Sequence, residues 1–152
     1  MKRKRLDEII RVDHAGEHGA IAIYKGQLSA LNLIGDKRTS FIISEMAEGE
    51  KVHAKEFDRL VKERKTRPTA LMPLWNLAGY TLGVMSVIGG KDSVMACTEA
   101  VEEIIDKHYS DQIEELESSR QEKDILKTIK KFHAEEVEHE KIAKNEISEN
   151  TP

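Results

Sequence analysis

The stretch EGEKVHAKEF, residues 48–57, decides the fold because it places polar groups on the apolar face of a helix. Glu50 and His53 share that face with apolar side chains at helical spacing, namely Ile43, Met46, Phe57, Leu60 and Val61. An unpaired buried charge costs several kcal/mol, whereas a whole domain has only about 5–15 kcal/mol of stability. The pattern therefore predicts that these two side chains have a partner of opposite charge.

Composition limits what the chain can be. Its 152 residues are enough for one domain with a real core. The net charge is −4 with 34% charged residues, and acidic and basic side chains alternate, which argues against nucleic-acid binding. The basic start, MKRKR, is expected to be a solvated tail rather than a headgroup contact, and it leads into LDEII rather than the apolar core of a signal peptide. We therefore expect a protein of the cytosol or of a membrane facing it.

The lone cysteine narrows the chemistry further. Cys97 cannot form a disulfide framework or a four-cysteine metal site within this chain. A single free thiol fits a reducing compartment.

Apolar spacing predicts two helical hairpins. In the first, over residues 6–62, apolar residues recur every three or four positions on both sides of Gly35. In the second, over 91–148, one amphipathic helix runs from Lys91 to about Leu116 and another from Asp124 to about Ile147, with a turn at Ser118 and Ser119. Alternating strand patterns are absent from the sequence.

Residues 68–90, PTALMPLWNLAGYTLGVMSVIGG, contain no charge. The segment approaches the length of a membrane span, but it contains Pro73, Asn76 and four glycines. Trp75 and Tyr80 favour the water–lipid boundary. Lying in the membrane interface, or forming an entrance for a greasy substrate, is therefore favoured over spanning, and a buried connecting helix is the alternative.

The two hairpins carry an internal repeat. The pattern Glu-x6-Tyr-x2-Gln-aliphatic begins at Glu17 and again at Glu102, 85 residues later. The pattern Glu-x-x-His begins at Glu50 and again at Glu136, 86 residues later. Each half therefore has one helix with a single glutamate, followed by a helix with Glu-x-x-His.

Helix geometry places these groups in one layer. Glu17 precedes Gly35 by 18 residues and Glu50 follows it by 15, so at about 1.5 Å per residue they return to nearly the same height. Glu102 and Glu136 lie 17 residues on either side of Ser119. We therefore predict an all-α, ferritin-like four-helix bundle of two hairpins with an apolar connecting helix between them, and a polar site in the core.

Two divalent cations would neutralise the four carboxylates of this layer. Glutamates and imidazoles without thiolate suit iron or manganese, and one Glu from each of two helices with Glu-x-x-His from the other two is the ligand set of ferritin-like di-iron proteins. A structural zinc site, which closes at four ligands, fits less well. The predicted metal ligands are Glu17, Glu50, His53, Glu102, Glu136 and His139. By the pseudo-symmetry, Glu50 and Glu136 bridge the two ions, Glu17 and His53 are terminal on one, and Glu102 and His139 are terminal on the other.

The remaining polar residues of the repeat receive less specific expectations. His14, His18, His108 and His133 are expected at the surface or behind the ligands. Tyr24 and Tyr109 are expected to pack in the core rather than to take part in redox chemistry. Asp13 and Asp106 are candidates to orient a ligand histidine through its second ring nitrogen.

Four motifs show a family resemblance: RVDHAGEHGA (11–20), RPTALMPLWNLAGYTLG (67–83), MACTEAVEEIIDKHY (95–109) and KKFHAEEVEHE (130–140). They resemble the demethoxyubiquinone hydroxylases, the di-iron monooxygenases of ubiquinone biosynthesis, and the similarity covers almost the whole chain. The family's six ligand positions match the six residues above. Members usually continue into a further apolar helix, whereas this chain ends at SENTP (148–152), so we expect a short variant that lacks the usual C-terminal apolar helix.

The resemblance implies a single ferritin-like di-iron domain over residues 1–152 that hydroxylates the ring of a polyprenyl demethoxyubiquinol. Its cofactors would be two iron ions, with dioxygen as co-substrate and NADH or the quinol as electron source. Its partners would be the polyprenyl quinol, the membrane interface and lipid-carrying or biosynthetic proteins, and an oligomer is compatible with it. It would lie on the cytoplasmic face of the cell membrane, or on the matrix side of the mitochondrial inner membrane. The alternatives are a rubrerythrin-like peroxidase, although CxxC pairs are absent, and an iron-binding or storage protein.

Overall fold

In the computed structural model, residues 1–148 are described, and they form five α-helices and no strand. The helices are α1 (Arg3–Ile34), α2 (Lys37–Arg64), α3 (Met72–Ile88), α4 (Lys91–Ser119) and α5 (Lys123–Ser148). The all-α prediction is confirmed. Of the closing SENTP, residues 149–152 lie outside the described part of the chain.

Local signals explain where the helices of each hairpin turn. Gly35 ends α1 in the left-handed region with φ 78°, and the Asp36 carboxylate accepts a hydrogen bond from the backbone N–H of Thr39 (3.0 Å) to begin α2. The second turn lies at Arg120 and Glu122, which have positive φ, so α4 runs three residues beyond the expected end at Leu116.

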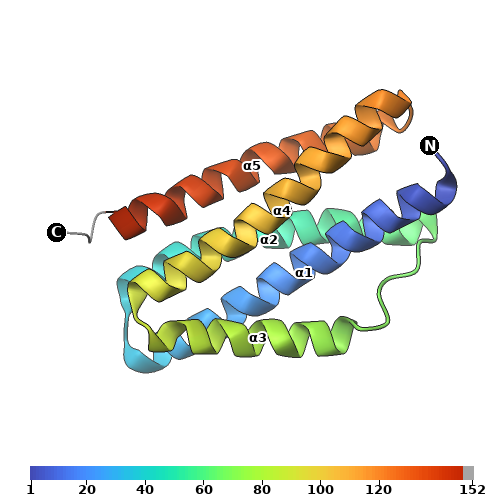
Figure 1. The fold of residues 1–152 in the computed structure, drawn as a ribbon. Coiled ribbons are helices and arrows are strands. Elements are labelled where there is room, and N and C mark those ends of the chain that lie inside the picture. The colour runs from blue at the N-terminus through green and yellow to red at the C-terminus, as the bar shows by residue number, and fades with distance from the viewer. Residues whose placement is uncertain (149–152) are drawn as a thin grey trace.

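The hairpins α1–α2 and α4–α5 make the four-helix bundle, and their turns lie at opposite ends of the molecule (Figure 1). Helix α3 lies outside the bundle, alongside α1, and leads into α4. The core fills the space between the hairpins with aliphatic and aromatic side chains, among them Tyr24, Phe57, Tyr109 and Ile129, all of which are fully buried.

Glycines bring α3 unusually close to α1. A Cβ atom on Gly83 would overlap the carbonyl oxygen of Ile23, and one on Gly26 would overlap that of Tyr80. The Trp75 indole donates a hydrogen bond to the carbonyl oxygen of Ala15 (2.8 Å), which fixes the first part of α3. The buried residues of α3 are Gly79, Gly83, Ser86 and Val87, and most of its large side chains lie elsewhere.

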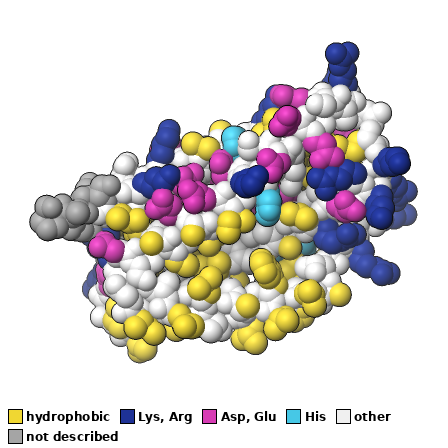
Figure 2. All heavy atoms as spheres, viewed as in Figure 1, with side chains coloured by type: hydrophobic (Ala, Val, Ile, Leu, Met, Phe, Trp, Pro, Cys, Tyr) yellow, Lys and Arg dark blue, Asp and Glu magenta, His cyan; other side chains and the backbone are white. Residues whose placement is uncertain are grey.

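Those large side chains are exposed. Hydrophobic side chains gather over the lower part of the molecule, where α3 lies, while charged side chains crowd the upper part (Figure 2). The exposed apolar residues at and within α3, here called the α3 outer face, are Leu71, Leu74, Trp75, Leu77, Tyr80, Leu82, Met85 and Ile88. Within the described residues, none of the helices combines the length and apolar character that crossing a membrane requires.

Candidate metal centre

All six residues that the spacing singled out lie together between the four bundle helices. They form two overlapping groups whose ligand atoms lie within 4.8 Å of one another. One group is Glu17, Glu50, His53 and Glu136, and the other is Glu50, Glu102, Glu136 and His139. Glu50 and Glu136 belong to both groups, which is the position that two bridging carboxylates would occupy.

Each imidazole of this layer turns its Nδ1 atom toward three carboxylates. His53 Nδ1 lies 2.8 Å from Glu136, 3.5 Å from Glu50 and 3.6 Å from Glu17. His139 Nδ1 lies 3.1 Å from Glu50 and 3.8 Å from both Glu102 and Glu136. The two halves of the layer are therefore related by the same pseudo-symmetry as the sequence repeat.

The layer leaves many buried polar atoms unsatisfied. Within residues 1–148, the buried atoms that make no hydrogen bond include His53 Nδ1, both oxygens of Glu136, and one oxygen each of Glu17, Glu50 and Glu102. Leaving a buried polar group unpaired costs about 1–3 kcal/mol, and more when the group is charged. Atoms that approach one another closely without hydrogen-bond geometry are arranged as ligands around a cation would be. The residues present therefore fit a pair of metal ions.

The pKa shifts of the layer also support a pair of bound cations. Burial raises the pKa of Glu17 and of Glu102 well above the usual value, and the neighbouring carboxylate of Glu50 adds to the shift. Burial opposes the charged form of His139, but its interactions with the nearby carboxylates of Glu102, Glu136 and Glu50 outweigh burial and raise its pKa to about 12. The pKa of His53 is raised by the same balance. Without metal, the layer therefore neutralises itself with protons, which two divalent ions would replace.

Two tyrosines link the halves of the layer crosswise. The Tyr24 hydroxyl on α1 donates a hydrogen bond to Glu102 on α4, and the Tyr109 hydroxyl on α4 donates one to Glu17 on α1. Both tyrosines are fully buried, as expected for core residues. Their contact with the carboxylates was not predicted, although the repeated Glu-x6-Tyr spacing, nearly two helical turns, was a signal for it.

The acid that contacts the outer nitrogen of the His53 ring is neither of the two predicted aspartates. The Nε2 atom of His53 lies 2.5 Å from Glu135, on α5. Asp13 instead accepts a hydrogen bond from Gln112 (2.7 Å), and Asp106 lies 2.8 Å from His133. The expectation that Asp13 or Asp106 orients a ligand histidine is therefore wrong, because Gln112 and His133 engage these two carboxylates and an acid of α5 contacts His53 instead.

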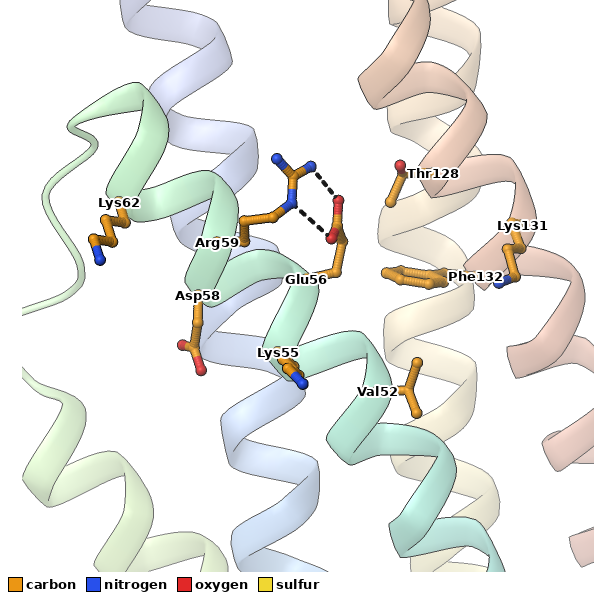
Figure 3. Close-up of a pocket in the computed structure, with 9 residues that line it drawn as sticks. All are labelled: Val52, Lys55, Glu56, Asp58, Arg59, Lys62, Thr128, Lys131 and Phe132. Atoms are coloured by element: carbon orange, nitrogen blue, oxygen red, sulfur yellow. Dashed lines mark hydrogen bonds and ion pairs between the residues drawn. The ribbon is translucent and has the colours of Figure 1, made fainter.

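A groove of about 580 Å³ opens between α2 and α5 near His53 (Figure 3). Its lining is mostly charged and includes Lys55, Arg59 and Lys131, with Glu56 paired to Arg59. Phe132 projects into the groove, and its ring stacks on that of His53 at a centroid distance of 4.0 Å. The aromatic ring of Phe132 thus covers the His53 side of the layer.

The four other histidines lie outside the layer, as expected. His108 is exposed on α4, and His133 lies beside Asp106. His14 and His18 both contact Asp58 on α2, a grouping that was not predicted, although the His-x-x-x-His spacing, about one helical turn, was a signal for it.

Comparisons with known proteins agree with this geometry. A model of the family described as "Ubiquinone biosynthesis protein COQ7" matches residues 4–152. The chain is 44% identical to the "NADPH-dependent 3-demethoxyubiquinone 3-hydroxylase, mitochondrial" of Dictyostelium discoideum, over all of this chain and 69% of that protein. It is 46% identical to the human protein of the same name, over all of this chain and 70% of that protein. It is also 44% identical to the "3-demethoxyubiquinol 3-hydroxylase" of Rhodospirillum rubrum, over 90% of this chain and 63% of that protein. Two repeated hairpins contribute a buried layer of glutamates and histidines, and the similarities cover nearly the whole chain. The chain therefore belongs to the COQ7 family of ubiquinone biosynthesis proteins.

Proposed function

We propose that this protein hydroxylates the ring of a polyprenyl demethoxyubiquinol in ubiquinone biosynthesis, with dioxygen as co-substrate and a pair of iron ions as cofactor. Membership of the COQ7 family supports the reaction and the pathway. The observation that supports an iron cofactor is the buried layer of four glutamates and two histidines with unsatisfied ligand atoms.

In this proposal the six side chains divide between two ions. Glu17 and His53 would hold one ion and Glu102 and His139 the other, and Glu50 and Glu136 would help to hold both, because only these two belong to both groups. Oxygen and imidazole donors without thiolate suit iron. When bound, the iron pair supplies the dioxygen chemistry that protein side chains cannot perform.

The chain's own residues position and shield that centre. Glu17, Glu50, His53, Glu102 and Glu136 are each at most 1% exposed, so bulk water has no direct access to these ligands. The two tyrosines hold one oxygen each of Glu17 and Glu102 and leave the other oxygen free to bind metal. Glu135 accepts the outer N–H of the His53 ring, which presents Nδ1 to the carboxylates.

The α3 outer face is the proposed contact with the membrane. Polyprenyl quinols dissolve in the bilayer, and burying each CH₂ group of a tail contributes about 0.8 kcal/mol. An apolar helix face with an exposed tryptophan and tyrosine suits the membrane interface. In a bacterium the protein would bind the cytoplasmic face of the cell membrane, and in an organelle the matrix side of the mitochondrial inner membrane. Peroxidase or storage activity would give this face no role.

The electrons would come from a reduced nicotinamide nucleotide or from the quinol itself. The Dictyostelium and human relatives are named as NADPH-dependent, and the Rhodospirillum relative is named without a nucleotide. A titration of the reduced nucleotides against the purified protein, with and without quinol, would identify the donor by the product formed per nucleotide oxidised.

The proposal is tested by replacing a bridging ligand. Glu50→Ala should abolish bound iron rather than only slow turnover, because it removes a ligand of both ions. Glu48→Ala is a matched control, since Glu48 is an exposed acid of the same helix that pairs with Lys51. In a cell that lacks its own hydroxylase, mass spectrometry should show ubiquinone restored by the wild type and by Glu48→Ala, and demethoxyubiquinone accumulating with Glu50→Ala. Normal iron content in Glu50→Ala would refute the ligand assignment, and failure of the wild type to make ubiquinone would refute the reaction.

A further inference from the structure

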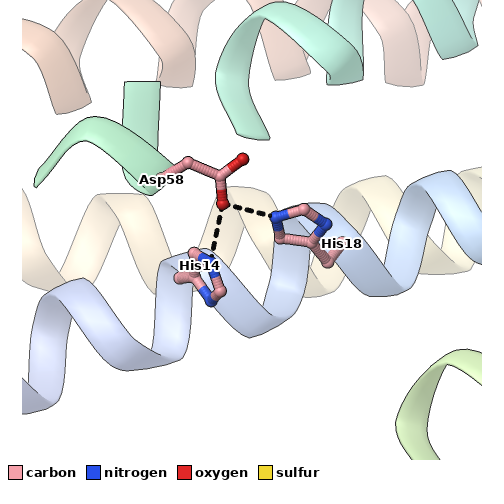
Figure 4. A group of neighbouring side chains, drawn as sticks. All are labelled: His14, His18 and Asp58. Atoms are coloured by element: carbon pink, nitrogen blue, oxygen red, sulfur yellow. Dashed lines mark hydrogen bonds and ion pairs between the residues drawn. The ribbon is translucent and has the colours of Figure 1, made fainter. Parts of the chain in front are cut away.

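A second cluster of potential metal ligands lies between α1 and α2, partly exposed and separate from the buried layer. His14 and His18 are one helical turn apart on α1, and both face Asp58 on α2 (Figure 4). This cluster shares no residue with the two groups of the layer. Neither the proposed reaction nor the proposed iron pair uses it.

The three side chains converge on one point. His14 Nε2 and His18 Nε2 each lie 2.8 Å from the same oxygen of Asp58, Oδ1, and the ligand atoms all lie within 4.8 Å of one another. Zinc bonds to nitrogen and oxygen are about 2.0–2.2 Å long, so tetrahedral ligand atoms lie about 3.3–3.6 Å apart. The two 2.8 Å contacts would therefore have to lengthen by roughly 0.5–0.8 Å to admit an ion, which small side-chain rotations can supply.

We propose that His14, His18 and Asp58 bind a third divalent transition-metal ion, of the class that prefers imidazole and carboxylate ligands, such as Zn²⁺. Two imidazoles and one carboxylate make three protein ligands and leave one position for water or another small ligand. The ion would tie α1 to α2 near the layer, because His14 precedes Glu17 by less than one turn on the same helix.

The surroundings of the cluster suit such an ion. The side chain of His14 is 10% exposed, that of His18 29% and that of Asp58 53%, so the site is anchored on one side and open on the other. Burial lowers the pKa of His14, against the opposing effect of Asp58, which favours the neutral ring that a metal requires.

The test counts Zn²⁺ in proteins whose buried layer has been disabled. Glu50→Ala protein, incubated with Zn²⁺ and freed of unbound metal by gel filtration, should retain one ion per chain. Adding His18→Ala or Asp58→Asn should remove that ion, and both changes fall on at least partly exposed side chains. Adding His133→Ala is the matched control, because His133 and Asp106 form a histidine–carboxylate pair without a second imidazole, so the ion should remain.

Two further measurements keep the outcome decisive. Circular dichroism should show the same helical content in all variants, and Zn²⁺ should raise the melting temperature of Glu50→Ala protein but not of Glu50→Ala/His18→Ala protein. If the layer still binds metal after Glu50→Ala, His18→Ala should nevertheless lower the Zn²⁺ count by one, so this proposal is tested separately from the iron pair. Equal Zn²⁺ content with and without His18 and Asp58 would overturn it.

Discussion

The close contact between α1 and α3 yields a prediction about a single methyl group. Replacing Gly83 by alanine places a Cβ against the carbonyl oxygen of Ile23 and near the backbone nitrogen of Gln27. This Cβ would lie at least about 1 Å inside the ordinary carbon–oxygen separation of about 3.3 Å. Backbone atoms inside a helix cannot rotate away, so α3 must move off α1 or the bundle must distort.

The expected magnitude follows from two opposing effects. Overpacking a well-packed contact costs about 1–3 kcal/mol. Alanine in a helix is otherwise about 0.5–1 kcal/mol better than glycine. Gly16 is the matched control, since it lies inside α1 and a Cβ there would meet nothing within 4 Å. We expect Gly83→Ala to lower the free energy of unfolding and Gly16→Ala to raise it by about 0.5–1 kcal/mol. Because both variants gain the alanine term, they should differ by the overpacking cost of about 1–3 kcal/mol.

The assay is urea unfolding followed by circular dichroism and by the fluorescence of Trp75, the only tryptophan, which is anchored to Ala15 across the same contact. A lower midpoint with unchanged slope would show loss of stability, and a red-shifted native emission would show that α3 had moved. If Gly83→Ala is as stable as Gly16→Ala, the packing of α3 on α1 is not the one described above.

Three further predictions concern the centre and the membrane. Two ions should displace up to about four protons, two from carboxyl groups with a raised pKa and two from imidazolium rings, so metal affinity should fall steeply as pH falls. Calorimetry in buffers of different ionisation enthalpy measures the number of protons released. Metal binding without proton release would count against the ligand set. Gly49→Ala would bring a Cβ to 2.9 Å from His139 Cε1, so it should weaken binding of the ion that His139 is proposed to hold more than binding of the other ion. Iron analysis that finds both ions held equally tightly would contradict this prediction. Replacing Leu74 and Trp75 by aspartate should release the protein from liposomes while iron content stays normal, and unchanged liposome binding would speak against the α3 outer face as the membrane contact.

The sequence predicted what depends on position along a helix. Spacing of apolar residues predicted the two hairpins, and similar distances from the turns predicted that Glu17, Glu50, Glu102 and Glu136 lie at one level. Such distances are reliable because the rise per residue of an α-helix is nearly constant.

Contacts that depend on how helices lie against one another were not predictable in this way. Glu135 behind His53 depends on the rotation of α5 relative to α2. The glycines of residues 68–90 were an argument only against a membrane span, whereas the structure shows Gly79 and Gly83 as buried positions where two helices touch. One-dimensional spacing defines the face of a helix but not the neighbour that the face meets.

The crossed tyrosines mean that the two halves of the centre are not independent. Tyr24 of the first hairpin holds Glu102 of the second, and Tyr109 of the second holds Glu17 of the first. Removing Glu17 would therefore delete a ligand and also leave the buried Tyr109 hydroxyl without its acceptor, at a cost of about 1–3 kcal/mol. The sequence repeat gives each hairpin one half of the ligands, but these hydrogen bonds require both hairpins to be docked before either half is complete. The metal layer is thus a product of docking between the hairpins, and each hairpin alone should lack it.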